Sequence, residues 1–300
     1  MKKEKLLRGI LTAVVALALG GCFDWNLELT VNKDGTGTLT ETMYFSPQTM
    51  ALLAMAASSE DSEQPPKNPL ESMIDKDELA KKAAQLGKGV TVKSAEIVKD
   101  EKGRQGTKVV YAVPDVNAFN LPLQADTEGG PTGGPDQTGQ GKAEEQKQET
   151  ARIQFIKAAS GAPAKLKIFM PKPKAEDKAK DTGDEQNGQA KDEDTPDDAE
   201  SKQAQAMMRQ MMGDMRMRLG IKVDGKITKT NATHVSDDKT GITLMDIDFG
   251  KLIADEKLFA KLQGMGQSQS FDEVKKMFSD PAFAKFVKIE FEDEVTVEFE

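Results

Sequence analysis

The sequence contains few of the residues on which enzymes and metal sites most often depend. Its 300 residues include one cysteine, one histidine, one tryptophan and two tyrosines. These counts exclude an intramolecular disulfide and a zinc site built from cysteine and histidine. Any Ser–His mechanism depends on His234, which ends a predicted strand beside Ser236 and Asp237, a context typical of an exposed turn. The sequence also lacks a G-x-S-x-G elbow and a Walker A run. We therefore expect a protein that is not an enzyme and carries no cofactor.

Positive charge is in the minority. The formal net charge of the chain is −9, and the first 21 residues carry a net +3, so the remainder stands near −12. Nucleic-acid binding requires basic patches, so we expect no nucleic-acid partner. A negatively charged chain is also repelled by anionic headgroups, so attachment to a membrane would require an anchor other than electrostatic attraction.

The N-terminal residues have the pattern of such an anchor. A basic start with Lys2, Lys3, Lys5 and Arg8 precedes an uncharged apolar run over 9–19, and two small residues then precede Cys22. This is the layout of a secretory signal, and the apolar run is too short to span a bilayer as a helix. The run Leu19-Gly20-Gly21-Cys22 resembles the lipobox of bacterial lipoproteins. No later apolar run has membrane-spanning length.

The lipobox resemblance implies cleavage between Gly21 and Cys22, a diacylglyceryl thioether on Cys22, and acylation of the new amino terminus. Two or three acyl chains hold a soluble domain firmly, because each buried CH₂ contributes about 0.8 kcal/mol. Residue 23 is Phe rather than Asp. If the host is Gram-negative, the sorting rule of that lipoprotein family implies the outer membrane. We expect an exported protein whose membrane partner is reached through this lipid anchor.

Two polar tracts divide the rest of the chain. The tract 124–150 has almost no large apolar residue, and 172–200 holds eleven acids and five lysines without an aliphatic side chain larger than Ala. Neither can offset the entropy cost of ordering, so we expect disorder in both. The expected organisation is a signal peptide over 1–21, an N-terminal α+β part over 22–123, a Gly/Gln-rich insertion over 124–150, a β-hairpin over 151–171, an acidic linker over 172–200 and a C-terminal α+β part over 201–300.

Period-two alternation predicts most of the strands. Trp25, Leu27, Leu29 and Val31 alternate with polar residues, and Asp34-Gly35 then forms a turn signal before a second alternating run that Glu41 interrupts. Further strands are predicted over 90–98, 108–113, 152–157, 165–170, 215–223, 226–234 and 241–249, with a final strand or hairpin over 287–299 that Asp293 interrupts. Helices are predicted over 47–57, 70–86, 201–213, 251–262 and 271–278. The pattern favours an α+β fold with antiparallel sheets, packed helices and an N-terminal signal helix.

The order of these motifs resembles the LppM-type envelope lipoproteins. A strand just after the lipid cysteine precedes a DGTGT turn, and a strand of the form v-G-x-i-x-x-T-N comes later, followed by an apolar strand. The matching positions are Val223, Gly225, Ile227, Thr230, Asn231 and Ile242. The chain departs from the pattern in its two polar insertions and in lacking tryptophan after Asn231. The resemblance implies an envelope domain with an antiparallel sheet and brings no catalytic residues.

A methionine cluster is the most unusual feature of the composition. Six of the 15 methionines fall within eleven positions: Met207, Met208, Met211, Met212, Met215 and Met217. The first five follow helical spacing, which favours core packing; an apolar contact surface and a Cu(I) site of thioether ligands are the alternatives. Asp34-x-Thr36 and Asp246-x-Asp248 do not form a calcium loop, and a hairpin turn and a strand's solvent face explain them.

Three functions follow from these patterns. The first is a non-enzymatic envelope lipoprotein that binds or scaffolds, with a protein partner or an apolar ligand such as a lipid held between sheet and Met-rich helix. The second is an envelope copper-handling protein that uses the methionine cluster. The third is a hydrolase with paired carboxylates, for which 50 acidic residues provide many accidental pairs.

Overall fold

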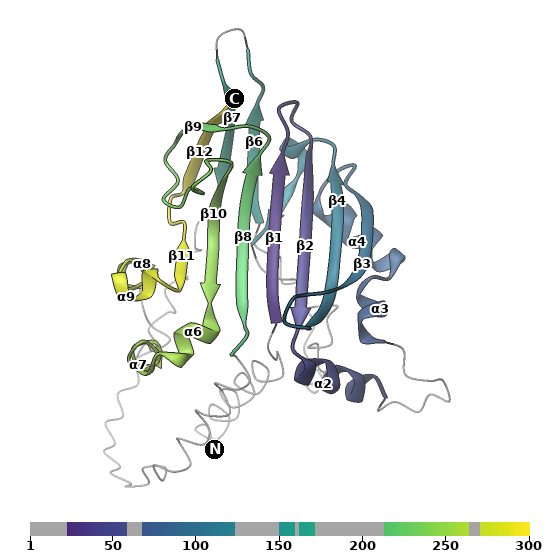
Figure 1. Ribbon diagram of the computed structural model, residues 1–300. Helices are drawn as coiled ribbons and strands as arrows, with labels where there is room; N and C mark the ends of the chain where they lie inside the picture. Colours follow the sequence, from purple (N-terminus) through teal and green to yellow (C-terminus); the bar gives the residue numbers. More distant parts are fainter. Residues whose placement is uncertain (1–22, 59–67, 124–149, 160–161, 172–212, 264–270) are drawn as a thin grey trace, which may run out of the picture.

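The computed structural model describes residues 23–58, 68–123, 150–159, 162–171, 213–263 and 271–300. Three predicted parts of the chain lie outside these residues: the signal peptide, the two polar tracts except Thr150, and the helix over 201–213 except Gly213. The α+β class is confirmed: alternating strands form two sheets, and short helices pack at their margins (Figure 1).

Strands from both predicted α+β parts share the larger sheet. It has seven strands in the order β11-β10-β8-β1-β2-β4-β3. Their bounds are β1 Phe23–Val31, β2 Gly37–Phe45, β3 Thr91–Lys99, β4 Gln105–Val113, β8 Arg216–Val223, β10 Gly241–Asp248 and β11 Val287–Ile289. The predicted β1–β2 hairpin is confirmed, with Phe23 opposite Phe45 and Val31 opposite Gly37. Gly35 takes a φ of 92° in its turn, a conformation that favours glycine.

One pair in this sheet departs from the antiparallel expectation. β1 and β8 run parallel, with Asp24 opposite Arg216 and Val31 opposite Val223. Parallel neighbours need a long connection, and residues 32–215, more than half of the chain, lie between these two strands. The sequence pattern gives the strands but not this direction.

The smaller sheet has five strands in the order β5-β6-β7-β12-β9. Their bounds are β5 Asn120–Pro122, β6 Thr150–Ile156, β7 Ala164–Phe169, β9 Ile227–Thr230 and β12 Glu294–Phe299. The predicted β6–β7 hairpin is confirmed. β9 is shorter than the strand predicted over 226–234, because the Asn231 side chain bonds the backbone of Glu294 and Thr296 and the ladder ends there.

The end of the chain is neither the single strand nor the hairpin predicted over 287–299. β11 pairs with β10 in the larger sheet, whereas β12 pairs with β7 and β9 in the smaller one. The chain crosses between the sheets at Glu290, whose buried carboxylate accepts the backbone N–H groups of Thr233, Phe291 and Glu292. The Glu290 carboxylate thus pairs the backbone N–H groups at the point where the chain leaves one sheet for the other. In a hairpin the partner strand would pair such groups.

Two predicted helices are each divided by an aspartate. The helix predicted over 70–86 is α3 Pro69–Met73 and α4 Lys76–Leu86, because Asp75 caps α4 by accepting the N–H groups of Asp77 and Glu78. Asp255 likewise accepts from Lys257 and Leu258 and separates α6 from α7. The remaining bounds are α2 Pro47–Ser58, a 3₁₀ turn η1 Val116–Ala118, α6 Phe249–Ala254, α7 Glu256–Gln263, α8 Phe271–Phe278 and α9 Pro281–Ala284.

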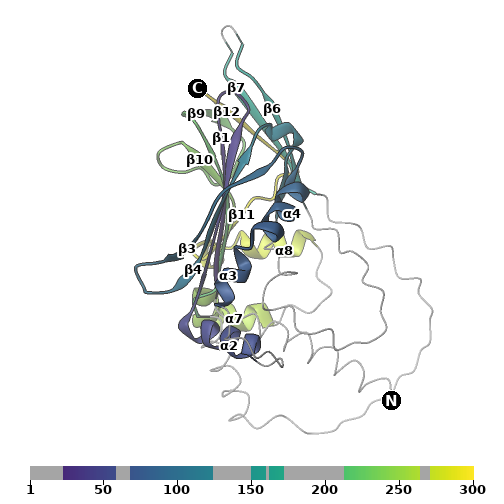
Figure 2. The same ribbon diagram turned by 90° about the vertical axis from the view of Figure 1, so that its right-hand side faces the viewer.

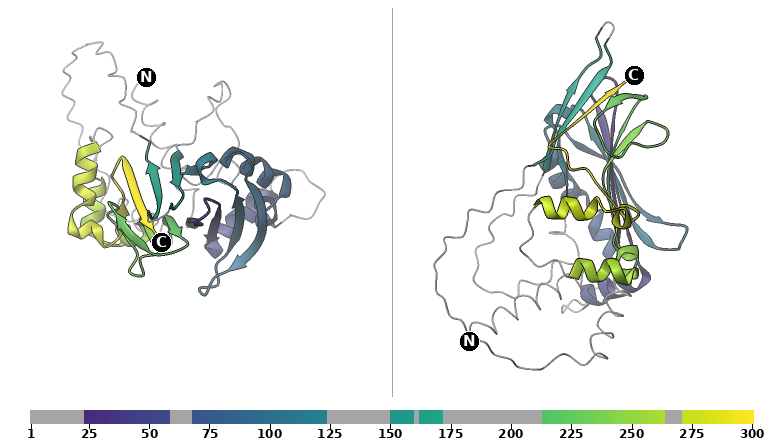
Figure 3. Two further views of the ribbon diagram at one scale, coloured as in Figure 1. Left: turned by 90° about the horizontal axis from the view of Figure 1, so that it is seen from above. Right: turned by 90° about the vertical axis from the view of Figure 1, so that its left-hand side faces the viewer.

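The main core lies between the two sheets and α4. Its largest fully buried side chains include Trp25, Tyr111, Phe119 and Phe299. Figure 2 shows α3, α4, α8 and the smaller sheet on one side of the larger sheet, which leaves the opposite, outer face without a covering layer of described elements. Two satellite cores form at opposite sides of the molecule, one under α2 and α3 and one among α6–α9 and β11 (Figure 3).

Candidate functional site

Most of the site residues predicted from the sequence lie outside the described chain. These are Gly21, Cys22, Met207, Met208, Met211 and Met212. Met215 is described: it is half-buried just before β8, and its carbonyl accepts the N–H of Gly250. Met217 lies on β8, packed against the main core. Lipidation of Cys22 and metal binding by the methionines stay predictions.

The structure gives ordinary structural roles to the other polar residues singled out above. His234 is half-buried, and its carbonyl accepts the N–H of Thr243. Asp34 accepts both the hydroxyl and the backbone N–H of Thr36, and these two bonds lower the pKa of the Asp34 carboxyl. Asp246 accepts two bonds from the Arg216 guanidinium, 2.8 Å each. Asp246 therefore lies on the outer face, as predicted, but within an ion pair.

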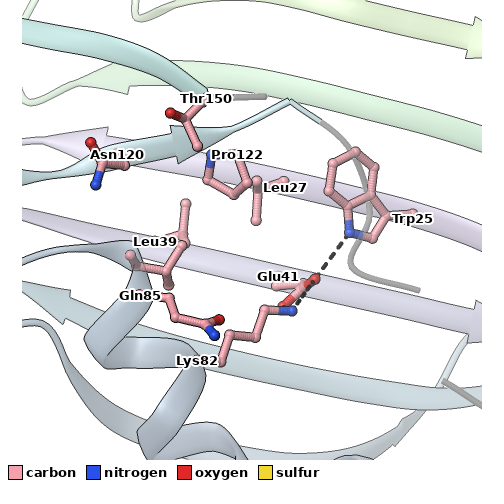
Figure 4. Close-up of a pocket in the computed structure, with 10 residues that line it drawn as sticks. Trp25, Leu27, Leu39, Glu41, Lys82, Gln85, Asn120, Pro122 and Thr150 are labelled. Atoms are coloured by element: carbon pink, nitrogen blue, oxygen red, sulfur yellow. Dashed lines mark hydrogen bonds and ion pairs between the residues drawn. The ribbon is translucent and has the colours of Figure 1, made fainter. Parts of the chain in front are cut away.

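A buried ionic cluster occupies the core face of the larger sheet. Glu41 interrupts the apolar alternation of β2, and its side chain points into the core with a residue exposure of 9%. Its Oε1 accepts the Trp25 indole N–H at 3.1 Å, and the Lys82 ammonium of α4 donates to Oε1 at 3.2 Å and to Oε2 at 3.0 Å (Figure 4). One carboxylate thus ties β1, β2 and α4 together.

A small cavity adjoins this cluster. Its lining includes Leu27, Leu39, Gln85, Asn120 and Thr150, and its volume is about 20 Å³. A cavity of that size holds about one water molecule, and the amide, hydroxyl and carboxylate groups around it supply the partners that a buried water requires. It is too small for an organic ligand.

The outer face of the larger sheet carries a second, larger polar system. Asp24, at the start of β1, accepts from Arg218 at 2.7 Å and from Arg104 at 3.0 Å, and Arg104 also donates to Asp100 at 2.7 Å. Burial opposes the charge of Arg104, but its bonds to the two carboxylates raise the pKa of the guanidinium overall. Lys222 pairs with Glu28 at 3.0 Å.

A groove of about 200 Å³ lies within this polar face, across β1, β8 and β10. Its lining includes two glycines, Gly220 and Gly241, and the polar residues Asn26, Glu28, Arg218, Lys222, Asp238 and Thr243. A Cβ on Gly241 would lie 3.0 Å from the Ile221 carbonyl oxygen, so the close strand contact favours glycine there. The Nε of Arg218 is buried and has no hydrogen-bond partner among the described residues. A buried donor of this kind is normally satisfied by water or a ligand.

One wall of the groove is the loop between β9 and β10. Asp238 accepts the hydroxyls of Ser236 and Thr240 at 2.6 and 2.8 Å and the Thr240 N–H at 3.1 Å. The two hydroxyl bonds lead in lowering the pKa of Asp238 to about 2. Lys226 donates to the Asp238 carbonyl. The loop is therefore held by side-chain bonds and keeps a charged carboxylate in the lining of the groove.

Comparisons with known proteins add one structural match. The folded domain of LppM from Mycobacterium tuberculosis, determined by NMR, aligns over 93% of this chain and 91% of that domain, with 8% sequence identity and a TM-score of 0.30. Similarity at this level supports no argument about fold or function. No protein-family model and no curated protein matches the sequence. None of the helices in the described residues is long and apolar enough to cross a bilayer.

Neither polar system was predicted from the sequence, although residues that indicate both are present in it. An acidic residue on the apolar face of a strand, as at Glu41, indicates a buried ionic partner. The residues between the apolar positions of β8, namely Arg216, Arg218, Gly220 and Lys222, define a charged face with a glycine gap at its centre. Only the sheet order shows that this gap faces Asn26 and Glu28 of β1.

Proposed function

We propose that this chain is a membrane-anchored envelope lipoprotein whose domain binds a ligand and performs no chemistry. The lipobox at 19–22 ends directly before β1, so an anchor on Cys22 would be joined to the folded domain. The groove over Gly220 is the observation that carries the binding role, because one of its lining side chains, Arg218, has an Nε without a hydrogen-bond partner among the described residues.

The chemistry of the groove favours a neutral, polyhydroxylated ligand. Two cations, Arg218 and Lys222, stand near the carboxylates Glu28, Asp238 and Asp246, so charge is nearly balanced across the lining. Amide and hydroxyl groups lie between them, and no aromatic ring lines the groove. Donors and acceptors at close spacing match hydroxyl groups, each of which can donate and accept. A strongly charged or purely apolar ligand would leave these groups unpaired.

Ligand-detected NMR with a series of neutral hexoses and disaccharides tests this proposal. We expect saturation transfer from the protein to at least one sugar, lost in Asn26→Ala and Lys222→Ala. Lys108→Ala is the matched control, since Lys108 lies on the same outer face, pairs with Glu96 on β3 and is not part of the groove lining. Transfer that persists in both groove variants would place binding elsewhere, and no transfer for any sugar would contradict the ligand class.

A second ligand class, an apolar molecule or lipid, is favoured by a different observation. Near the β1 start, the core face of the larger sheet carries Phe23, Met43, Met217 and Ile247, all only half-buried. The two satellite cores flank these positions (Figure 3). Native mass spectrometry of Phe23–Glu300 tests for a co-purifying lipid; a stoichiometric adduct of lipid mass supports this ligand, and a clean apo mass after incubation with lipid extract contradicts it.

A further inference from the structure

The distance between the predicted anchor and the folded domain fixes how the domain meets the membrane. This inference rests on the proposed lipid on Cys22. Phe23, the next residue, already belongs to β1 and pairs with Phe45 of β2. One residue spans at most about 3.6 Å, so no flexible tether separates the acyl chains from the sheet. The end of the sheet that contains Phe23 and Phe45 must therefore lie at the bilayer surface.

Helix α2 lies at this same end. It begins at Pro47, two residues after Phe45, and Figure 1 shows it below the β1 start and the β2 end. Ser46 fixes its entry by accepting the N–H of Thr49. The helix PQTMALLAMAAS contains no charged residue over 12 positions, in a chain of which 30% is charged. At that composition three or four charges are expected, so their absence is a marked local property.

Burial divides α2 into two sides. Leu53 packs with Phe45 and Leu70 in a satellite core that Met50 and Met73 border. Gln48, Ala51 and Ala54 are exposed on the other side. Placing such a surface against lipid headgroups removes no charge from water, which is the main cost of transferring a protein surface into an interface. By contrast, helices α6 and α7, on the other side of the molecule, expose charged residues, among them Lys251 and Lys257.

We propose that the exposed side of α2 rests on the bilayer surface beside the lipid anchor and holds the domain in one orientation. β1 then leads away from the membrane, and the β1–β2 turn at Lys33 lies at the far end (Figure 1). Because α2 has no cation, the contact does not depend on anionic lipid. The outer-face groove, which lies along the side of the sheet, stays open to the surroundings.

Single introduced cysteines test this orientation, because Cys22 is the only native cysteine and its thiol carries the lipid. The variants are Ala51→Cys, Ala54→Cys and Lys33→Cys, each in the full-length protein purified from membranes and labelled at the new cysteine with an environment-sensitive fluorophore. Each is reconstituted in phosphatidylcholine vesicles that contain lipid spin-labelled near the headgroup, which quenches nearby fluorophores. We expect strong quenching and blue-shifted emission at 51 and 54, and neither at 33. Ala54→Glu should reduce quenching at 51 to the level at 33, whereas Ala54→Ser should not.

Vesicle flotation separates the two ways in which the idea can fail. Protein that floats with the vesicles but shows the same weak quenching at 51, 54 and 33 overturns the α2 contact and leaves the anchor standing. Protein that does not float overturns the lipid anchor itself, and the α2 contact with it.

Discussion

Replacing Lys82 by methionine tests whether the buried cluster at Glu41 contributes to stability as its geometry indicates. The variant keeps the length and apolar stem of the side chain but leaves the Glu41 carboxylate with the Trp25 indole as its one remaining donor among the bonds described above. The side-chain exposures are 23% for Lys82 and 11% for Glu41, so the pair is largely but not fully withdrawn from water. At 3.0 Å and an effective dielectric constant of about 20, the gross attraction is about 5.5 kcal/mol.

The net cost is smaller than the gross attraction. Ordering the lysine side chain and desolvating both groups offset part of it, and the adjacent cavity lets water reach the stranded carboxylate. We expect Lys82→Met to lower the free energy of unfolding by about 2 kcal/mol, within the range for hydrogen bonds to charged groups. For a domain of this size, that corresponds to a fall in Tm of about 4–8 °C.

Urea unfolding of Phe23–Glu300 provides the assay, and Trp25 provides the signal. It is the only tryptophan, it is 1% exposed in the fold, and its indole contacts Glu41. Lys81→Met is the matched control, because Lys81 pairs with Glu78 at the surface, where exposures are 69% and 67%; it should lower the stability far less than Lys82→Met does. Glu41→Gln combined with Lys82→Met should recover most of the loss, since the amide oxygen still accepts from Trp25 and no buried charge remains. Equal costs for the two lysine variants, or no recovery in the double variant, would refute the reasoning.

Three further predictions concern the outer face. Asp24→Asn should lower the free energy of unfolding by about 1.5–3 kcal/mol, measured by urea unfolding, because Asp24 is buried between Arg104 and Arg218; a loss below 0.5 kcal/mol contradicts a role for this ion pair. Asp238 should titrate near 2 by carboxyl-detected NMR, and Ser236→Ala should move its pKa up toward 3.8; an unchanged value in the variant contradicts the bond. Because folding lowers the pKa of Asp238, the ionised carboxylate contributes its full stabilisation above about pH 4 and loses it as the pH falls toward 2. The urea midpoints of wild type and Ser236→Ala should therefore converge near pH 2.

Much of the fold follows from local patterns in the sequence. The β1–β2 and β6–β7 hairpins and helix α2 agree with alternation, turn residues and the Ser46-Pro47 start. Three of the failures share a physical cause: Asp75, Asp255 and Glu290 bond to backbone N–H groups and redirect the chain. A single carboxylate hardly changes the hydrophobic periodicity from which helices and strands are predicted. The parallel pairing of β1 with β8 depends on contacts between strands that more than half of the sequence separates, and no local window contains both.

The candidate site was less predictable than the fold. The groove exists because Gly220 on β8 lies opposite Glu28 on β1 and beside Thr243 on β10, and this juxtaposition follows from sheet order alone. By contrast, the predicted anchor at Cys22 rests on a contiguous motif and needs no tertiary structure. The anchor could therefore be predicted from the sequence alone, whereas the groove could not.

Mass spectrometry of the N-terminal peptide from the membrane-purified protein tests the central claim most directly. We predict that the mature chain begins at Cys22, that this residue carries diacylglycerol and an N-acyl chain, and that Cys22→Ala releases the protein from the membrane fraction. An unmodified Cys22, or a Cys22→Ala variant that stays with the membrane, would contradict the account of this chain as a lipoprotein.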